Sequence, residues 1–317
     1  MNNLIEESGG KVTGWGMALG TETVTNADLA AKMDTSNEWI LERTGISERR
    51  IGGSTSGLAV RAGQQALEMA GVKATEIDLL ILATTTPDDQ APATSANVQY
   101  QLGLTCGAMD LNAACSGFVY SLVTGFGFLK LGFKRILIIG SETLSRITDW
   151  DDRSTAILFG DGAGAVVIEA EKGNGDLLGW NLGCEGSLRD ILYAEIGGTI
   201  VMAGQEVFCK AVIAMTESAK SSIAASGLSP DEISFVIPHQ ANIRIIESAM
   251  KRLGIPAERA VSVLHKTGNT SSASIPIALF EAISDGRIRS GDNLLLVGFG
   301  AGMTSASAII HWGGIDG

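Results

Sequence analysis

The segment 110–122 contains a cysteine in a setting that suits nucleophilic chemistry. Cys115 follows a pair of alanines, precedes Ser116 and Gly117, and leads into an apolar run. This pattern predicts that a helix begins here, with the sulfur at the helix N-terminus, where free backbone N–H groups and the macrodipole favour a thiolate. The small neighbours would let a second surface approach the sulfur. The alternative is a buried cysteine that acts only as a small apolar side chain.

Two further polar residues have types and positions that suit such a site. His239 directly follows the apolar run 235–237, and ligands of α/β sheets usually bind at strand ends. Asn269 lies in a second small-residue segment that also looks like the start of a helix. We assign structural roles to the other two histidines, His265 and His311. A Cys, a His and an Asn can form a nucleophilic site, as in papain-type hydrolases.

The composition indicates a globular protein with a large core. The 317 residues include 45% apolar residues and 40 glycines, and the net charge of −12 argues against a general nucleic-acid-binding protein. The four cysteines contain no C-x-x-C pair, so neither a zinc site nor a disulfide framework is indicated. We expect no signal peptide, no membrane span and a cytoplasmic location.

Apolar patterning predicts alternating strands and helices. We expect strands at 11–19, 77–83 and 135–140, helices at 23–33 and 58–70, and a turn into a strand at 159–169. A fresh helix start is expected at 34–39, where Thr35 and Glu38 have the spacing of a capping box. Buried strands with helices between them imply layered α/β packing.

The second half of the chain repeats this order weakly. Segments 74–82 and 230–238 match at an offset of 156, segments 100–104 and 251–255 at 151, and segments 136–140 and 294–298 at 158. These matches predict two similar α/β halves that share one core, which we place at residues 1–175 and 176–317. An offset of 154 makes Asn269 the counterpart of Cys115, facing it across a pseudo-twofold axis.

Taken together and in order, the motifs resemble those of β-ketoacyl–acyl-carrier-protein synthase III. The resemblance covers essentially the whole chain and is carried by segments 34–46, 110–120, 159–164, 202–208, 238–242 and 268–271. It implies an α/β thiolase-like fold, with two similar halves in a five-layered α-β-α-β-α arrangement, and a homodimer. It also implies decarboxylative Claisen condensation of an acyl-CoA primer with malonyl-acyl-carrier protein, which initiates fatty-acid synthesis.

The resemblance also implies roles for individual residues. Cys115, His239 and Asn269 would be the catalytic triad: the cysteine takes the acyl group from acyl-CoA, and the other two bind the thioester carbonyl of the malonyl carrier protein. The enolate left by loss of CO₂ needs hydrogen-bond donors placed in advance. A second oxyanion would be held by the backbone N–H groups of Cys115 and Ala301. No tightly bound cofactor and no metal are implied.

Substrate-binding residues are implied in the same way. Trp39 and Arg153 match positions that sandwich the CoA adenine, Arg43 matches one near the CoA phosphates, and Thr35 belongs to the same CoA-binding set. Three basic residues spaced i, i+7 and i+8 share one helical face that suits an acidic carrier protein: Arg244, Lys251 and Arg252. A solvated helix face is the alternative interpretation of these three.

Three departures from the family pattern bear on the acyl pocket. Gln205 replaces a frequent Asn, and Met303 begins a segment that replaces a frequent aromatic-Thr-Trp sequence. Ala91 falls where several short-chain enzymes have a Phe that projects into the partner subunit's acyl pocket. These differences leave the preferred acyl chain open.

Other functions remain alternatives. A family relative that primes a secondary-metabolite pathway, or transfers the acyl group to another acceptor, would use the same triad. A papain-type hydrolase is disfavoured, because the local C-G-[SA]-C-[WY] signature is absent. A non-catalytic carrier-protein-binding subunit is disfavoured because all three polar residues are present. The glycine-rich segments 160–164 and 300–302 do not form G-x-G-x-x-G, which argues against dinucleotide binding.

Overall fold

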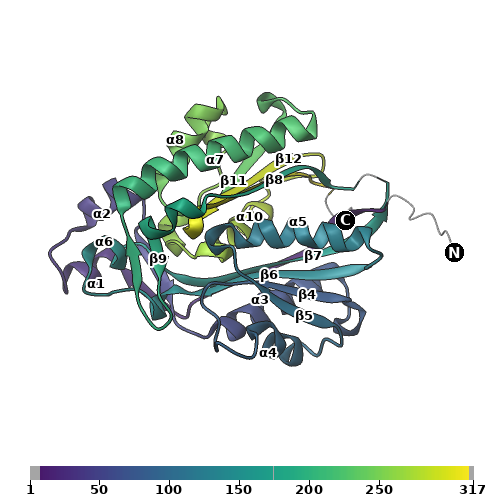
Figure 1. The fold of residues 1–317 in the computed structure, drawn as a ribbon, viewed down its shortest axis with the longest axis horizontal. Helices are drawn as coiled ribbons and strands as arrows, with labels where there is room; N and C mark the ends of the chain where they lie inside the picture. Colours follow the sequence, from purple (N-terminus) through teal and green to yellow (C-terminus); the bar gives the residue numbers. More distant parts are fainter. Residues whose placement is uncertain (1–7, 174, 314–317) are drawn as a thin grey trace.

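Two β-sheets and three helical layers make up the fold in the computed structural model, which describes residues 8–173 and 175–313 (Figure 1). The first sheet has the order β1-β7-β6-β4-β5 and the second has the order β11-β12-β13-β8. Helices α5 and α10 lie between the sheets, α3 and α4 cover the first sheet, and α7 and α8 cover the second. The predicted five-layered thiolase-like architecture is therefore confirmed.

The strands of the first sheet are β1 (Ser8–Leu19), β4 (Leu79–Ala83), β5 (Gly107–Leu111), β6 (Arg135–Thr143) and β7 (Asp161–Lys172). Those of the second are β8 (Leu177–Cys184), β11 (Phe235–Pro238), β12 (Asn293–Gly300) and β13 (Thr304–His311). Two small sheets pair β2 (Glu22–Thr25) with β3 (Glu48–Ile51), and β9 (Leu192–Ala194) with β10 (Ile200–Met202).

The helices of the first half are α1 (Asn26–Ala30), α2 (Asn37–Thr44), α3 (Thr55–Ala70), α4 (Thr94–Gln101), α5 (Gly117–Lys130) and α6 (Arg153–Ala156). Those of the second are α7 (Gly204–Ser226), α8 (Ile243–Leu253), α9 (Leu264–Thr267) and α10 (Ser274–Ser284). The 3₁₀ turns at the site include η2 (Ala114–Ser116), η4 (Gly186–Ile191), η7 (Ser271–Ala273) and η8 (Ala301–Met303). Among the described residues, no helix has the length and apolar character needed to cross a membrane.

The two sheets repeat one topology. Along β1-β7-β6-β4, two antiparallel pairings are followed by a parallel one, and β8-β13-β12-β11 shows the same sequence of pairings. The predicted duplication is therefore confirmed, with β5 as an additional edge strand of the first sheet. The chain changes from one large sheet to the other between Lys172 and Leu177.

Patterns in the sequence explain the central strands. Every residue of β4 is buried, and β6 is buried after its first residue, as expected for strands covered on both faces. Glycines allow α3 to approach β1 closely, since a Cβ on Gly16 would lie 2.3 Å from the carbonyl oxygen of Ala62. A larger residue at this position would therefore push α3 off the sheet.

Two local predictions were wrong. The segment 23–33, expected to be one helix, contains the end of β2 and the short helix α1, because residues 22–25 pair with β3. The expected capping box of Thr35 and Glu38 is absent. Ser36 is the N-cap of α2, and its side chain accepts the Trp39 N–H.

Candidate active site

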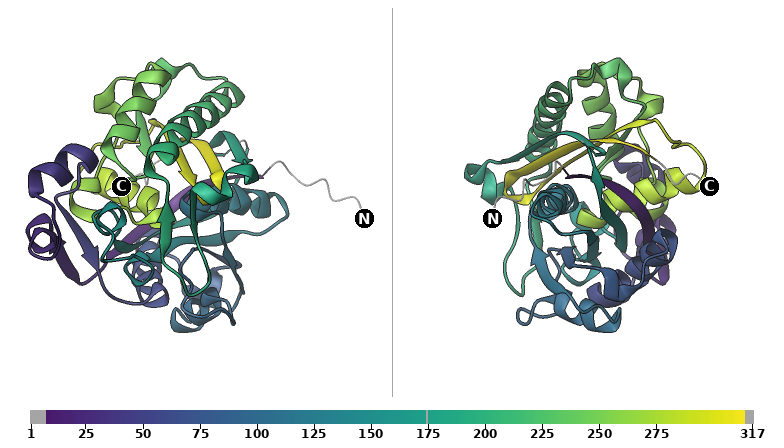
Figure 2. Two further views of the ribbon diagram at one scale, coloured as in Figure 1. Left: turned by 60° about the vertical axis from the view of Figure 1, so that its left-hand side comes forward. Right: turned by 90° about the vertical axis from the view of Figure 1, so that its right-hand side faces the viewer.

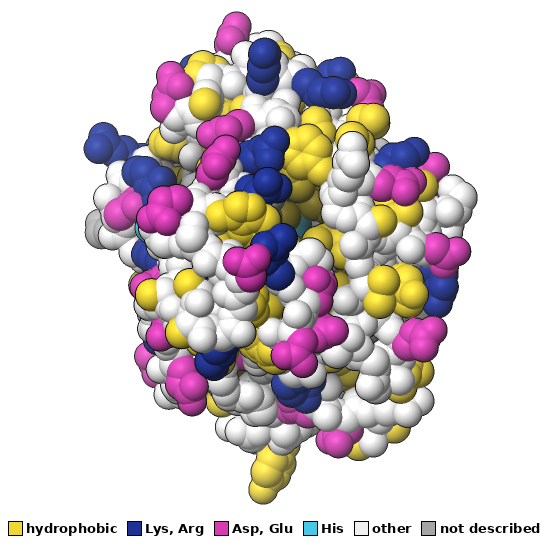
Figure 3. All heavy atoms as spheres, turned by 90° about the vertical axis from the view of Figure 1, so that its left-hand side faces the viewer, with side chains coloured by type: hydrophobic (Ala, Val, Ile, Leu, Met, Phe, Trp, Pro, Cys, Tyr) yellow, Lys and Arg dark blue, Asp and Glu magenta, His cyan; other side chains and the backbone are white. Residues whose placement is uncertain are grey.

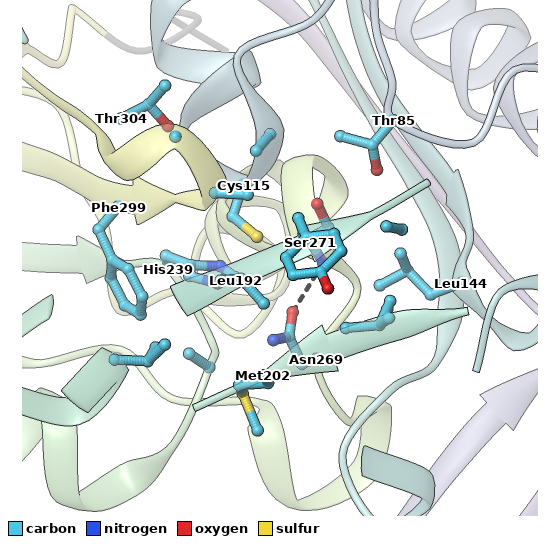
Figure 4. A pocket seen from close by; sticks show the side chains of 18 of the residues that line it. Thr85, Cys115, Leu144, Leu192, Met202, His239, Asn269, Ser271, Phe299 and Thr304 are labelled. Carbon is cyan, nitrogen blue, oxygen red and sulfur yellow. Dashed lines mark hydrogen bonds between the residues drawn. The ribbon is translucent and has the colours of Figure 1, made fainter. Parts of the chain in front are cut away.

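A cavity of about 410 Å³ lies where the two halves meet. Cys115, His239 and Asn269 all line it, and Figure 4 shows their side chains directed into the same space. The sequence-predicted triad is thus brought together from three separate segments of the chain. On the face of the molecule drawn in Figure 3, hydrophobic side chains surround a hollow with basic and acidic side chains beside it.

Cys115 is in the middle of η2, immediately before α5. The residue is partly accessible, yet the sulfur is desolvated, and this burial raises the pKa of the thiol to about 12. A hydrogen bond from the Ser271 side chain lowers the pKa and the negative charge of Glu142 raises it. The expectation that the helix N-terminus would favour a resting thiolate was therefore wrong: desolvation outweighs it, and the resting group is a thiol.

His239 is held rigidly at the end of β11. Its backbone N–H donates to the Val297 carbonyl at 2.8 Å, and its ring packs edge-on against Phe299, with centroids 5.4 Å apart. The side chain is 1% exposed, and burial lowers the pKa of the imidazole to about 3, so the ring is neutral. Its Nδ1 lies 2.7 Å from the Ser274 hydroxyl oxygen. When Ser274 donates this hydrogen bond, the ring hydrogen is on Nε2.

Asn269 is fixed through both its backbone and its side chain. Its N–H donates to the Leu158 carbonyl at 2.8 Å, and its own carbonyl accepts the Gly160 N–H at 3.0 Å. The side-chain oxygen accepts the Ser271 N–H at 2.8 Å. Because the oxygen is engaged in this way, the amide NH₂ group remains as a donor for the cavity (Figure 4).

The equivalence of Cys115 and Asn269 was wrong by three residues. The true counterpart of Asn269 is Asn112, whose side-chain oxygen accepts the Ala114 N–H at 3.1 Å just as Asn269 accepts the Ser271 N–H. Each asparagine precedes a matching 3₁₀ turn and helix, η2–α5 after Asn112 and η7–α10 after Asn269. The offset is therefore 157 residues (112 to 269), which makes Ser272 the counterpart of Cys115.

The end of β12 lies against the nucleophile. A Cβ on Gly300 would be 2.5 Å from the backbone nitrogen of Cys115, so only glycine permits this approach. Ala301, the next residue, lines the cavity as Cys115 does. The Thr304 hydroxyl donates to the Ala113 carbonyl at 2.9 Å and ties the two segments together. The backbone groups assigned to an oxyanion hole are thus on adjacent segments.

The four residues expected to bind CoA lie outside the cavity lining. Trp39 and Arg43 come from α2, and the Arg43 and Arg153 guanidinium carbons are 4.5 and 4.7 Å from the centre of the Trp39 ring. Thr35, half-buried, precedes the N-cap of α2. Asn242, which does line the cavity, donates to the Arg43 carbonyl at 2.8 Å and connects α2 with the cavity.

The basic residues of α8 are exposed on its outer face, as expected: Arg244, Lys251 and Arg252. Arg244 is nearest the cavity, because its guanidinium lies 5.7 Å from the centre of the Phe208 ring, and Phe208 lines the cavity.

None of the three residues assigned to the acyl pocket lines this cavity. Ala91 and Gln205 are exposed, and Met303 is 3% exposed within the core cluster beneath α7. Sequence reasoning missed the residues that form much of the wall: Leu144, Ile147, Arg189, Leu192, Tyr193 and Ile200. Several come from η4, β9 and β10, a segment with no recognisable motif. Thr85 and Ser271 were also missed, although Ser271 directly follows the motif residue Asn269.

Comparisons with known proteins agree with this geometry. Residues 109–186 match the sequence model of the family 3-oxoacyl-(acyl-carrier-protein) synthase III, and residues 223–312 match the model of its C-terminal part. A β-ketoacyl-(acyl-carrier-protein) synthase III from Rhodospirillum centenum is 48% identical, over 95% of this chain and 98% of its own.

The chain belongs to this family.

Solved structures extend the comparison. The 3-oxoacyl-(acyl-carrier-protein) synthase III of Aquifex aeolicus is 44% identical, with a TM-score of 0.94 over 96% of this chain and 100% of the other. The priming β-ketosynthase of the R1128 polyketide biosynthetic pathway is 32% identical, with a TM-score of 0.93 over 98% of each chain. As a member of this family, the chain is a condensing acyltransferase that initiates fatty-acid synthesis, which excludes the papain-type hydrolase and the non-catalytic subunit.

Proposed function

We propose that this synthase transfers the acyl group of an acyl-CoA primer to Cys115 and then condenses it with the malonyl thioester of an acyl-carrier protein. The convergence of Cys115, His239 and Asn269 on one cavity carries the proposal. In the first half-reaction the Cys115 sulfur attacks the primer carbonyl, the carbon–sulfur bond to CoA breaks, and the thiol proton leaves with the CoA thiolate. Splitting the condensation through an acyl-enzyme replaces one hard step with two easier ones.

The second half-reaction needs hydrogen-bond donors that do not give up their protons. Loss of CO₂ leaves an enolate on the extender thioester, and the His239 Nε2–H and the Asn269 amide supply donors for its oxygen. The low pKa of buried His239 means that the ring is neutral, so the site gains no fixed positive charge. The enolate carbon then attacks the acyl-Cys115 carbonyl. The oxyanion formed there is held by the Cys115 and Ala301 N–H groups until the Cys115 sulfur leaves.

Recognition of the two substrates is assigned to different surfaces. Trp39, Arg43 and Arg153 present a flat ring and guanidinium groups that suit the adenine and phosphates of CoA, with Thr35 beside them. Adenine can lie between Trp39 and Arg153 only after the guanidinium withdraws from its present 4.7 Å separation. The exposed α8 cations suit an acidic carrier protein on a chain whose net charge is −12.

The remaining features of the proposal concern assembly and location. We assign the enzyme to the cytoplasm as a homodimer, without a tightly bound cofactor, and treat residues 1–175 and 176–317 as its two thiolase-like halves. The acyl pocket is assigned to the inner end of the cavity, with Gln205 and Met303 acting through their neighbours Gly204 and Gly302, which line it. In the homodimer, Ala91 of each subunit would line the acyl pocket of the other subunit.

A second candidate function is priming of a secondary-metabolite pathway. The similarity to a polyketide priming β-ketosynthase, at 32% identity over 98% of each chain, supports this second function. The triad serves both functions, so the preferred primer and carrier protein distinguish them.

Intact-protein mass spectrometry tests the proposed function. After incubation with acyl-CoAs of graded length, one acyl group is expected on Cys115, and the preferred length identifies the primer class. Cys115→Ser should lose labelling by orders of magnitude, since a hydroxyl is far less ionised than a thiol. Cys184→Ser and Cys209→Ser, at exposed cysteines, are the matched controls and should label normally. Label on Cys106, Cys184 or Cys209 would overturn the assignment.

A further inference from the structure

Glu142, near the end of β6, is a fully buried carboxylate that the proposed mechanism leaves without a role. Its side chain is 0% exposed, and among the residues that the structure describes no Lys, Arg or His forms an ion pair with it. A buried charge is strongly unfavourable unless it is paired or hydrogen-bonded. The hydrogen bonds that Glu142 accepts must therefore offset the free-energy cost of burying its carboxylate.

The Glu142 carboxylate accepts hydrogen bonds from both halves of the molecule. Oε2 accepts from three residues after β4: the Thr86 hydroxyl at 2.6 Å, the Thr85 N–H and hydroxyl at 3.0 Å each, and the Thr84 hydroxyl at 3.3 Å. Oε1 accepts from the Ser272 hydroxyl at 2.8 Å and the Ser272 N–H at 3.4 Å, and it also accepts the Thr85 N–H at 3.2 Å. Glu142 thus fastens the loop after β4 to η7.

The turn η7 contacts two functional groups of the site, the Cys115 thiol and the Asn269 side-chain amide. Ser271 is a non-glycine residue with φ +48°, a left-handed conformation that persists only where the surroundings enforce it. Its side chain hydrogen-bonds to Cys115, and its N–H holds the oxygen of Asn269 at 2.8 Å (Figure 4). The neighbouring Ser272, anchored on Glu142, is one of the contacts that enforce this conformation.

The opposite end of the Glu142 network also reaches the cavity. Thr85, which donates to Glu142 through both its N–H and its hydroxyl, lines the cavity wall. The negative charge of Glu142 is close enough to Cys115 to disfavour its thiolate. One side chain therefore connects the pocket wall, the extender-binding amide and the nucleophile.

We propose that Glu142 is a positioning residue of the condensing reaction. Its carboxylate holds η7 against the loop after β4, so that Ser271 faces Cys115 and the Asn269 amide faces the extender thioester. Its negative charge adds to the larger effect of desolvation on the Cys115 thiol. The proposal rests on the proposed function of the site.

Half-reaction kinetics provide the first test. Glu142→Gln keeps the shape but turns an NH₂ group toward donors, and Glu142→Asp keeps the charge but shortens the reach. Both should slow decarboxylation of malonyl-carrier protein roughly 10- to 100-fold, as expected for a donor displaced by a fraction of an ångström to an ångström. Acylation of Cys115 should fall much less. Glu217→Gln, on the exposed face of α7, is the matched control and should leave both rates unchanged.

Thiol alkylation provides a readout that a purely structural role would not change. Glu142 from β6 is the group whose charge acts on the pKa of Cys115, and His239, which lines the same cavity, is neutral throughout pH 7–10. Glu142→Gln removes a negative charge near Cys115, so the pKa of the thiol should fall and the pH profile of its alkylation by iodoacetamide should shift to lower pH. At a fixed pH below that pKa, alkylation should become about tenfold faster for each unit by which the pKa falls. Glu142→Asp should leave the profile near that of the wild type.

The outcomes separate the two proposals. A Glu142→Gln protein with an unshifted alkylation profile and a wild-type ratio of the half-reactions would overturn the role of Glu142. If Glu142→Gln does not fold, Glu142→Asp decides: selective loss of decarboxylation supports the role, and equal or no loss refutes it. A wild type unable to decarboxylate malonyl-carrier protein would refute the proposed function instead, while the alkylation profile, which needs no substrate, would still test the charge of Glu142.

Discussion

Ala114 and Ser271 have the same left-handed backbone conformation, with φ values of +49° and +48°, at matching positions of the two halves. Within the described chain they are the two non-glycine residues with positive φ. Each lies two residues after an asparagine whose side chain accepts its N–H. The duplicated turn serves two purposes: in the first half it places Cys115 directly after the left-handed residue, and in the second it turns Ser271 itself toward Cys115.

The Ser271 hydroxyl should therefore make the thiol more reactive. Its hydrogen bond lowers the pKa of Cys115 against the opposing effect of burial. In Ser271→Ala this stabilisation of the thiolate is lost, so alkylation of Cys115 by iodoacetamide should become several-fold slower at any fixed pH between 7 and 10. Ser187→Ala, at an exposed serine of η4, is the control. An alkylation profile unchanged in Ser271→Ala would show that the hydroxyl does not act on the sulfur.

Asn269→Asp isolates the donor function of the amide. The aspartate can still accept the Ser271 N–H, which is 2.8 Å from the present side-chain oxygen, but it offers no N–H to the extender thioester. Decarboxylation should fall by roughly 10²–10³, the usual effect of removing one oxyanion donor, while acylation of Cys115 is largely retained. His239→Ala should show the same selectivity. Rates measured separately with malonyl-carrier protein and with acyl-CoA decide this, and equal loss of both would instead make His239 the general base for the thiol.

Burial of His239 should also appear in the pH dependence of stability. The folded-state pKa of about 3 lies below the ordinary value of 6.5. Above pH 6.5 both states carry a neutral ring. As the pH falls from 6.5 toward 3, only the unfolded chain takes up the proton, so the free energy of unfolding decreases.

The measurement is urea denaturation at pH 7 and pH 5, at one protein concentration, for wild type and His239→Gln. Between pH 7 and pH 5 the free energy of unfolding of the wild type should fall by on the order of 2 kcal/mol more than that of the variant, since one pKa unit corresponds to about 1.4 kcal/mol. Groups such as Asp176, whose pKa burial raises to about 6, are common to both proteins and cancel in the comparison. Equal losses would mean that the ring is protonated in the folded state.

The sequence predicted the central architecture because buried parallel strands are continuous apolar runs, and β4 and β6 are such runs. The triad could be predicted because its motifs are local. The counterpart of Cys115 was misplaced, because the three matches have offsets from 151 to 158 and do not fix one register. Only the structure shows that Asn112 and Asn269 make the same hydrogen bond. Segment 23–33 was misjudged because β2 exists through pairing with residues 48–51, which helix propensity cannot register.

Burial explains the other failures. The position of Cys115 before a helix indicated a stabilised thiolate, but desolvation is a property of the complete fold and raises the pKa instead. The wall formed around β9 and β10 has no sequence signature, because hydrophobic residues there become a pocket only when the hairpin folds over the cavity. Glu142 could not be distinguished in sequence from a solvated strand-end glutamate.

The final prediction concerns primer length and depends on the homodimer. Ala91 is exposed in the single chain, and we propose that its segment closes the acyl pocket of the partner subunit in a homodimer. A side chain as small as alanine leaves space where a phenylalanine would fill the end of the tunnel. Each further CH₂ buried there would contribute about 0.8 kcal/mol until the tunnel wall is met. We therefore expect primers longer than acetyl to be accepted.

Ala91→Phe should restore preference for short primers by refilling that space. The decisive measurement is kcat/KM against acyl length from acetyl to medium chains, for wild type and Ala91→Phe. Ala96→Phe, at an exposed position of α4, tests whether any added aromatic ring in this segment has the same effect. The wild-type profile should extend beyond acetyl and contract in Ala91→Phe. A wild type restricted to acetyl-CoA, or a profile that Ala91→Phe leaves unchanged, would place the end of the acyl tunnel elsewhere.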